Sequence, residues 1–170
     1  MSKIFIISDT HFGHEKIIEY CNRPFDNTFI MNQTIINNWN KVVAKNDIVW
    51  HLGDVLLGSS EQLYKIVQQL NGTKYLIRGN HCKSHSDGAL LKAGFKTVYK
   101  YPIILEKKYI LSHAPLELAA GSNFCNIHGH EHSNGPTKTD KNYYNVSVEM
   151  INYKPLAFNI IKKHFNTYNT

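Results

Sequence analysis

The sequence predicts an α/β protein in which a parallel sheet with crossover helices packs against a second, largely antiparallel set of strands. Two observations lead to this prediction. The first half alternates short β-branched runs with amphipathic segments, which is the pattern of parallel strands joined by helices. The second half carries strand-like runs that follow one another closely. The 170 residues fit one core, so residues 1–170 are expected to form a single domain.

Three strands and three helices are expected in the first half. Lys3–Ser8 is short, rich in β-branched residues and closed by polar ones, as in a buried strand. Asn27–Ala44 carries apolar residues at helical spacing. Ser59–Gln62 resembles a capping box, which opens a helix that runs to Leu70. The other expected elements are strands at Asp47–Leu52 and Lys74–Arg78, and a short helix from about Asp87 to Lys92 that stops at Gly94.

The second half is expected to be mostly strands. Val98–Leu105 and Tyr109–Ser112 flank Glu106–Lys108, which has the polar character of a hairpin turn. Further strands are expected at Cys125–His128 and Tyr143–Val148. A C-terminal helix is expected to start at Pro155 and to reach about His164.

Composition narrows the class of protein and of ligand. Apolar residues make up 42% and charged residues 19%, which argues for a globular chain and against a disordered one. Nineteen Lys and Arg residues outnumber thirteen Asp and Glu residues, and the net charge of +6 favours acidic ligands such as phosphates or nucleic acid.

Two further features bear on location. The first apolar run, Ile4–Ile7, is too short for the core of a signal peptide or for a membrane span, and no later stretch comes closer, so no membrane partner is expected. The three cysteines, Cys21, Cys82 and Cys125, are odd in number and form no CxxC pair. A disulfide framework or thiolate zinc site is therefore not expected, and a reducing, cytoplasmic location is.

Polar side chains follow five of the predicted strands at the point where each strand ends. They are Asp9 and His11, then Asp54, then Asn80 and His81, then His113, and finally His130 and His132. Ligands of open α/β sheets bind in the crevice outside the carboxyl ends of the strands, so we expect these side chains to converge on one edge.

A cluster of this kind predicts metal ions. Carboxylates and imidazoles would repel one another or stay half-protonated unless a cation lay between them. Imidazole, carboxylate and amide ligands without thiolate suit a divalent metal of the manganese, iron or zinc type. The candidate ligands number seven, too many for one tetrahedral zinc and enough for two ions sharing a carboxylate: Asp9, His11, Asp54, Asn80, His113, His130 and His132. Two ions about 3.5–4 Å apart clamp a hydroxide and the oxygens of a phosphoryl group.

The same residues carry a family resemblance. The ordered set Asp9-x-His11, Gly53-Asp54, Gly79-Asn80-His81, His113 and Gly129-His130-x-His132 resembles the signature of the calcineurin-like metallophosphoesterases. One piece alone is common by chance, whereas all five in order over positions 9–132 are specific. The fragments Ser8–His14, His51–Asp54 and Asn145–Glu149 resemble the small, uncapped bacterial and phage members. The resemblance implies a two-sheet β-sandwich flanked by helices, in four α/β/β/α layers.

The resemblance also implies a role for each residue. One ion would be held by Asp9, His11, Asp54 and His132, and the other by Asp54, Asn80, His113 and His130, so that Asp54 bridges the two. A metal-bridging hydroxide would attack phosphorus in line with the leaving group. His81 would then protonate the leaving oxygen or stabilise its charge. Two divalent ions are expected, manganese first, with iron, zinc, nickel or cobalt as alternatives.

One position departs from the family pattern. The family usually has Asp or Glu directly after Gly-Asn-His, where this chain has Cys82. A carboxylate there would orient the imidazole of His81, so either another acid such as Asp87 takes this part or His81 is a weaker general acid. Other candidates for contact with the substrate phosphate are His14, His51 and Arg78, with a structural role as the alternative for each.

The leading hypothesis is therefore a dinuclear-metal phosphoesterase that hydrolyses phosphodiesters or phosphomonoesters of small, nucleotide-like substrates. A metal-dependent nuclease acting on RNA or DNA is the first alternative, supported by the net charge of +6. The second is a metal-binding scaffold that has lost catalysis, for which Cys82 is the only argument.

Overall fold

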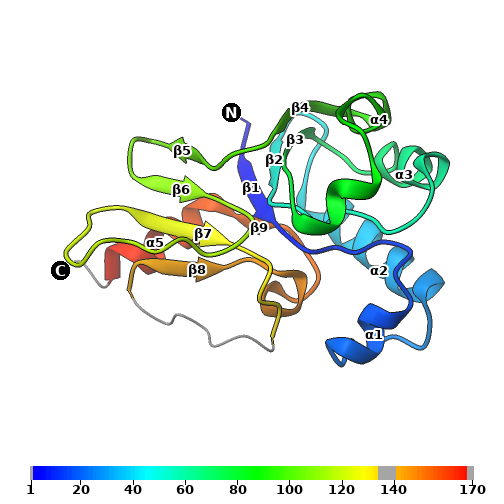
Figure 1. Ribbon diagram of the computed structural model, residues 1–170, viewed down its shortest axis with the longest axis horizontal. Coiled ribbons are helices and arrows are strands. Elements are labelled where there is room, and N and C mark those ends of the chain that lie inside the picture. Colours follow the sequence, from blue (N-terminus) through cyan, green and yellow to red (C-terminus); the bar gives the residue numbers. More distant parts are fainter. Residues whose placement is uncertain (1, 134–140, 168–170) are drawn as a thin grey trace.

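The computed structural model describes residues 2–133 and 141–167, and these form two mixed β-sheets flanked by helices (Figure 1). The predicted α/β class with two sheets and outer helices is confirmed. The two sheets approach each other where strand β1 ends. In Figure 1, β2, β3 and β4 lie to the right of β1, and β5 to β8 lie to its left.

The first sheet is built by the strand–helix alternation of the first half. Its strand order is β4 (Phe95–Tyr99), β3 (Thr73–Ile77), β2 (Ile48–His51), β1 (Ile4–Ile7) and β9 (Leu156–Ala157). The pairs β1–β2, β2–β3 and β3–β4 are parallel, and only β9 is antiparallel to its neighbour. The carboxyl ends of four strands therefore lie at one edge, which confirms the parallel arrangement predicted for this half.

The second sheet differs from the prediction of a largely antiparallel set. Its order is β5 (Ile103–Leu105), β6 (Tyr109–Leu111), β7 (Cys125–His128) and β8 (Tyr143–Asn145). Only the β5–β6 hairpin is antiparallel, whereas β6–β7 and β7–β8 are parallel. Parallel strands require long connections, because the chain must return to the edge of the sheet where the previous strand began before the next strand starts.

One predicted strand is in fact two. Val98–Leu105 was expected to be a single strand, but the chain leaves the first sheet at the end of β4 and enters the second sheet at β5. Pro102 lies between them, where its missing N–H and fixed φ interrupt a ladder. The hairpin turn itself is as predicted, with Glu106 and Lys107 in the left-handed region.

The helices begin where the sequence supplies a cap. They are α1 (Lys16–Tyr20), α2 (Thr28–Val42), α3 (Ser60–Val67), α4 (Asp87–Ala93) and α5 (Phe158–Thr167), with 3₁₀ turns at Asn80–Ser84 and Val148–Ile151. The predicted capping box of α3 is confirmed, because Gln62 N–H donates to the Ser59 hydroxyl at 3.2 Å and Ser59 N–H donates to the Gln62 side chain at 2.8 Å. Helix α5 starts later than expected, since Leu156 and Ala157 pair with β1 first.

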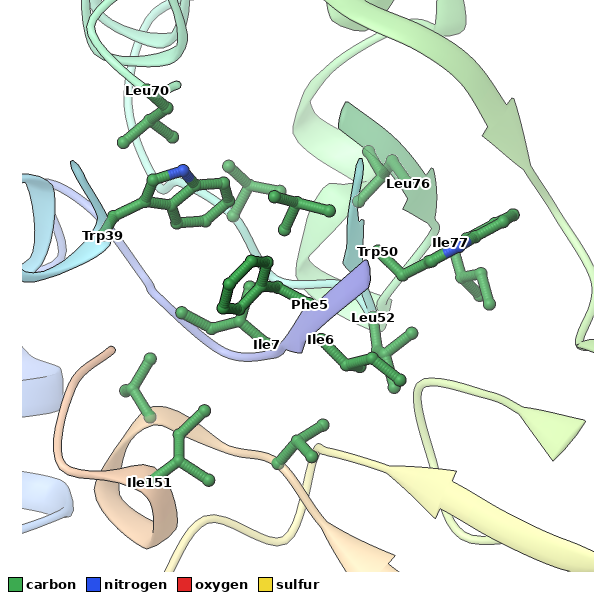
Figure 2. Packing of buried hydrophobic residues seen from close by; sticks show 14 of the residues in the cluster. Phe5, Ile6, Ile7, Trp39, Trp50, Leu52, Leu70, Leu76, Ile77 and Ile151 are labelled. Carbon is green, nitrogen blue, oxygen red and sulfur yellow. The ribbon is translucent and has the colours of Figure 1, made fainter. Parts of the chain in front are cut away.

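Apolar side chains on both sides of β1 form the core. Figure 2 shows Phe5 and Ile7 on the side of β1 that faces Trp39 of α2, and Ile6 on the other side. The Trp39 ring is fully buried, and its Nε1–H donates to the Asn71 carbonyl oxygen at 3.0 Å. This packing fixes α2 against the first sheet.

The two sheets are joined at the residue that follows β1. Ser8 N–H donates to the Val146 carbonyl oxygen at 2.9 Å, and Val148 N–H donates to the Ser8 carbonyl oxygen at 3.1 Å. This isolated parallel bridge places the end of β1 beside the segment that follows β8. Polar residues after strands of both sheets therefore meet at one place.

Asp47 makes a pH-dependent contribution to the stability of the fold. Its side chain is buried and accepts hydrogen bonds from the backbone N–H groups of Lys3 at 2.8 Å and Ala44 at 2.9 Å. These bonds hold the pKa of Asp47 below its usual value. Stability gained in this way is complete above the pKa of an unfolded Asp, about 3.9, and is lost as the pH falls further.

We therefore expect Asp47→Asn to lower the free energy of unfolding at pH 7 by about 1–2 kcal/mol, and the difference from the wild type to shrink below about pH 4. Urea unfolding from pH 7 to pH 3 measures both. The matched control is Asp26→Asn at an exposed position, for which we expect little change. An Asp47→Asn deficit that stayed constant with pH would contradict the assignment.

Among the residues that the structure describes, no helix is long and apolar enough to cross a membrane.

Candidate metal centre

Strained backbone marks the place where the strand ends meet. Five of the seven predicted ligands are non-glycine residues in the left-handed region: Asp9 (φ 59°), His11 (φ 48°), Asp54 (φ 54°), His130 (φ 71°) and His132 (φ 50°). Each such residue costs on the order of 1 kcal/mol or more, and clusters of them are found at active sites and ligand clamps. The fold thus maintains an unfavourable local geometry where these side chains come together.

The two carboxylates are held in the same manner. In Asp9, Oδ2 accepts hydrogen bonds from His130 N–H at 2.8 Å and from the Ser147 hydroxyl at 2.9 Å, whereas Oδ1 is buried without a partner. In Asp54, Oδ1 accepts from His81 N–H at 2.9 Å. Its Oδ2 lies 3.7 Å from His11 Nε2. One oxygen of each carboxylate is fixed by the protein and the other faces the cluster.

Asp54 lies between two imidazoles. Its Oδ2 is 3.7 Å from His11 Nε2 and 3.4 Å from His113 Nε2, which places this oxygen within reach of both halves of the cluster. Burial raises the pKa of a carboxyl group, but the hydrogen bond and charge of His113 outweigh it and lower the pKa of Asp54 to about 2. Asp54 is therefore ionised at neutral pH.

His11 is a neutral base in this cluster. Burial lowers its pKa to about 2, so its ring is uncharged at neutral pH. Its Nε2 is buried and has no hydrogen-bond partner. A buried imidazole nitrogen without a partner, beside two carboxylates, has the orientation of a metal ligand.

Polar atoms of three other residues surround the Nε2 atom of His113. Its Nδ1 lies 2.8 Å from the Leu52 carbonyl oxygen and donates to it, which leaves a lone pair on Nε2 of the neutral ring. That Nε2 lies 2.8 Å from Asn80 Oδ1, 3.2 Å from His130 Nδ1 and 3.4 Å from Asp54 Oδ2. Burial lowers the pKa of His113, but the hydrogen bond with Asp54 outweighs burial and raises this pKa overall. These groups favour a cation at this point.

His132 faces the cluster from the segment after β7. Its Nδ1 lies 3.0 Å from Glu149 Oε1, and its ring lies 5.2 Å from that of His11, centroid to centroid. Burial lowers the pKa of His132, but hydrogen bonds with Cys21 and Glu149 outweigh this and raise it to about 10. A metal ion bound by His132 would have to displace a proton, so its affinity would rise with pH.

The donors form two groups of metal-binding size. The ligand atoms of Asp9, His11 and His132 lie within 4.8 Å of one another, and so do those of Asp9, Asp54 and His113. Neutral imidazole, ionised carboxylate and amide oxygen are the ligands that divalent transition metals accept. The residues present therefore fit the divalent metal ions that the sequence predicts. The observation behind this conclusion is that Asp9 Oδ1 and His11 Nε2 are buried without a hydrogen-bond partner.

Gly129 permits the close approach of the two sheets at this centre. A Cβ atom at this position would overlap the Ser8 hydroxyl and the Asp9 carboxylate. Any larger residue would push the His130 N–H away from Asp9 Oδ2, which it holds. The glycine of the Gly-His-x-His segment is therefore explained by space and not by a positive φ.

His81 and His14 lie at the open side of the cluster. His81 is exposed, and its ring centroid is 5.4 Å from that of His11. His14 is partly buried, with its Nδ1 3.4 Å from His11 Nδ1 and its ring 6.5 Å from that of His81. The structure brings both next to the predicted ligands.

His51 is not at the surface of the site. It is fully buried, with its Nε2 3.0 Å from the Thr10 hydroxyl and its Nδ1 accepting from Gly53 N–H at 3.3 Å. Burial lowers the pKa of His51 to about 3, so the ring is neutral. This geometry gives His51 a structural position behind Thr10, which lies between the candidate ligands Asp9 and His11 in the sequence, and no access to a substrate phosphate.

Arg78 and Asp87 also face each other and not the cluster. The Arg78 guanidinium binds the Asp87 carboxylate and donates to the carbonyl oxygens of Cys82 at 2.6 Å and His85 at 2.9 Å. Asp87 also lies 3.5 Å from Lys100. These contacts engage the Asp87 carboxylate with Arg78 and Lys100, so they give no support to the suggestion that Asp87 replaces the missing acid beside His81. Arg78 instead holds the turn that carries Asn80.

Sequence reasoning missed two buried charged residues at the centre. Arg23 and Glu149 form an ion pair of 2.7 Å, with Arg23 also bonded to the Asp9 and Thr10 carbonyl oxygens and Glu149 to His132. A signal was present, because the chain has only two arginines, Arg23 and Arg78, among its nineteen basic residues. Arginine in place of lysine often indicates a fixed, multiply bonded site.

Known proteins show the same sequence pattern and fold. A family model described as calcineurin-like phosphoesterase matches residues 2–168. The uncharacterized protein MJ1445 of Methanocaldococcus jannaschii is 40% identical over 172 residues, which cover 96% of this chain and 91% of that protein. The Gene 66 protein of Mycobacterium phage L5 is 36% identical over 88 residues, which are 50% of this chain and 42% of that protein.

A solved structure is also similar to this chain. The crystal structure of AQ665, a protein of unknown function from Aquifex aeolicus, has a TM-score of 0.75 and 28% sequence identity, and the match covers 96% of this chain and 99% of that one. The phage relative and this structure of similar extent support the resemblance to the small members. The chain belongs to the calcineurin-like phosphoesterase family.

Proposed function

We propose that this protein is a dinuclear-metal phosphoesterase that hydrolyses small phosphoesters, with a preference for diesters. The observation that carries the proposal is the position of Asp54 Oδ2, 3.7 Å from His11 Nε2 and 3.4 Å from His113 Nε2. Members of the family use divalent metals, and a carboxylate oxygen between two sets of imidazoles is the arrangement that two ions share.

In this proposal Asp9, His11, Asp54 and His132 hold one ion, and Asp54, Asn80, His113 and His130 hold the other. When bound, the two ions supply Lewis-acid stabilisation of phosphoryl oxygens and activate water. The protein fixes the ligand directions through the hydrogen bonds to Asp9 Oδ2 and Asp54 Oδ1. His81, exposed beside His11, donates a proton or a hydrogen bond to the leaving oxygen, and His14 lies close enough to contact the phosphate.

The surroundings of the centre favour a small substrate with a group on each side of phosphorus. Asn80, His81 and His130 are exposed, so the phosphate can be approached from solvent. An open depression of about 740 Å³ lies beside Asn80, and its lining includes the ion-paired side chains of Arg78, Asp87 and Lys100. A nucleotide-like ester can place its second substituent there, which a diester requires.

The test is hydrolysis of bis-p-nitrophenyl phosphate by protein that has been stripped with a chelator and reloaded with one metal at a time. We expect turnover with Mn²⁺ or with one of Fe²⁺, Zn²⁺, Ni²⁺ and Co²⁺, and its loss in excess chelator. Comparison with p-nitrophenyl phosphate measures the preference for diesters. Absence of turnover with all five metals and both substrates would exclude the proposal and favour a metal-binding scaffold.

A further inference from the structure

Arg23 uses its whole guanidinium group inside the protein. The side chain is fully buried and lies between α1 and α2 in the sequence. Nε and Nη2 reach Glu149 Oε1 at 2.8 and 2.7 Å, and Nη1 donates to the Thr10 carbonyl oxygen at 2.9 Å and to Met31 Sδ at 3.4 Å. Nη2 also donates to the Asp9 carbonyl oxygen at 2.8 Å. With five N–H donors, the group is fully used.

The first consequence concerns the segment that carries Asp9 and His11. Both residues have a left-handed backbone, at φ 59° and 48°. Arg23 satisfies the carbonyl oxygens of Asp9 and Thr10 with charge-assisted bonds. This compensates the strain that directs Asp9 Oδ1 and His11 Nε2 into the cluster.

The second consequence concerns His132. Glu149 Oε1 accepts from Arg23, and the same oxygen lies 3.0 Å from His132 Nδ1. A carboxylate at this distance accepts a hydrogen bond from Nδ1–H, so the proton of the neutral ring stays on Nδ1 and the lone pair is on Nε2. An outer carboxylate that fixes the tautomer and rotation of a histidine ligand raises metal affinity by about 10–100-fold.

Both consequences fall on one half of the centre. Within the described residues, the hydrogen bonds of Arg23 and Glu149 reach the segment of Asp9–His11 and the ring of His132, and none reaches Asn80, His113 or His130. The other half has a different support, the Leu52 carbonyl oxygen behind His113. The two ion positions thus have different supports, although Asp54 and Asp9 connect them: Asp9 belongs to both donor groups, and its Oδ2 accepts from His130 N–H at 2.8 Å.

We infer that the buried Arg23–Glu149 pair is a positioning device for one of the two metal ions, the one held by Asp9, His11 and His132, and that it makes this ion the tighter of the two. The inference rests on the proposed function, since it requires two ion positions. A third metal position at Cys21, His132 and Glu149, whose donor atoms also lie within 4.8 Å of one another, is opposed by the charge of Arg23 at 2.7 Å from Glu149.

The experiment is calorimetric titration of metal-free protein with Mn²⁺, together with the Mn²⁺ electron paramagnetic resonance spectrum at one and two equivalents. We expect two binding steps in the wild type. Glu149→Gln keeps the size and polarity of the side chain and removes its charge, and we expect the tighter step to weaken by about 10–100-fold while the weaker step changes less than twofold. Asn80→Ala should do the opposite, which assigns each step to its half.

Three further measurements make the outcome decisive. Arg23→Lys keeps the charge but cannot form the fork, and it should weaken the same step as Glu149→Gln, whereas Glu61→Gln on the exposed face of α3 should leave both steps unchanged. Thermal unfolding of each metal-free variant reports general destabilisation. Equal weakening of both steps, or an unchanged tighter step, would overturn the inference while two-ion binding by the wild type stands. A wild type that binds fewer than two ions would remove the proposed function as well.

Discussion

Asp54→Asn is expected to abolish phosphoesterase activity, with a decrease in kcat/KM of at least about 10³-fold. The substituted side chain has nearly the same shape, and its oxygen can still accept the His81 N–H bond now made by Asp54 Oδ1 at 2.9 Å. The change removes the charge from an oxygen that lies 3.7 Å from His11 Nε2 and 3.4 Å from His113 Nε2. Ions that supply several kcal/mol of charge stabilisation would be lost together, and about 4 kcal/mol corresponds to 10³-fold.

Metal content and fold separate this explanation from misfolding. Elemental analysis should find that Asp54→Asn loses both ions, while its circular dichroism spectrum stays that of the wild type. Asp26→Asn at an exposed position should keep full activity and metal content. An Asp54→Asn protein that retained two ions and more than a tenth of wild-type activity would contradict the bridging role.

Asn80→Ala is expected to have the second-largest effect, a decrease in kcat/KM of about 10²–10³-fold, because loss of one ion removes part of the charge stabilisation and leaves the rest. Asn80 is exposed, and its Oδ1 lies 2.8 Å from His113 Nε2, so its removal opens the half that contains His113 and His130 without cutting into the core. We expect metal content to fall from two ions to one.

The control for this variant is Asn46→Ala in an exposed turn before β2, which should behave as the wild type. The number of ions lost is as informative as the decrease in activity. Loss of both ions in Asn80→Ala would mean that the two halves are not independent, and an unchanged activity would remove Asn80 from the site.

The first sheet could be predicted from the sequence because its elements obey local rules. The strand at β1 is a short β-branched run, and Ser59 with Gln62 forms the capping box that opens α3. The direction of the strands in the second sheet could not be predicted in this way. Pairing between β6, β7 and β8 depends on where long connections return the chain, and nothing in the apolar pattern of those strands distinguishes parallel from antiparallel neighbours.

The convergence of the candidate ligands could be expected because parallel strands end at one edge, so that Asp9 and Asp54 had to approach each other. Their supports were less visible. Arg23 lies in a short segment without periodicity, and its partner Glu149 is 126 residues away. His51 illustrates the opposite error, since a histidine three residues before Asp54 invites a role in the site, yet its two nitrogens bond within the protein.

The most direct test of the central claim is an anomalous-difference map from crystals grown with Mn²⁺. The proposal predicts two peaks about 3.5–4 Å apart on either side of Asp54 Oδ2, one within ligand distance of His11 and the other of His113. A single peak, or peaks that leave the Asp54 carboxylate uncoordinated, would contradict a shared two-ion centre.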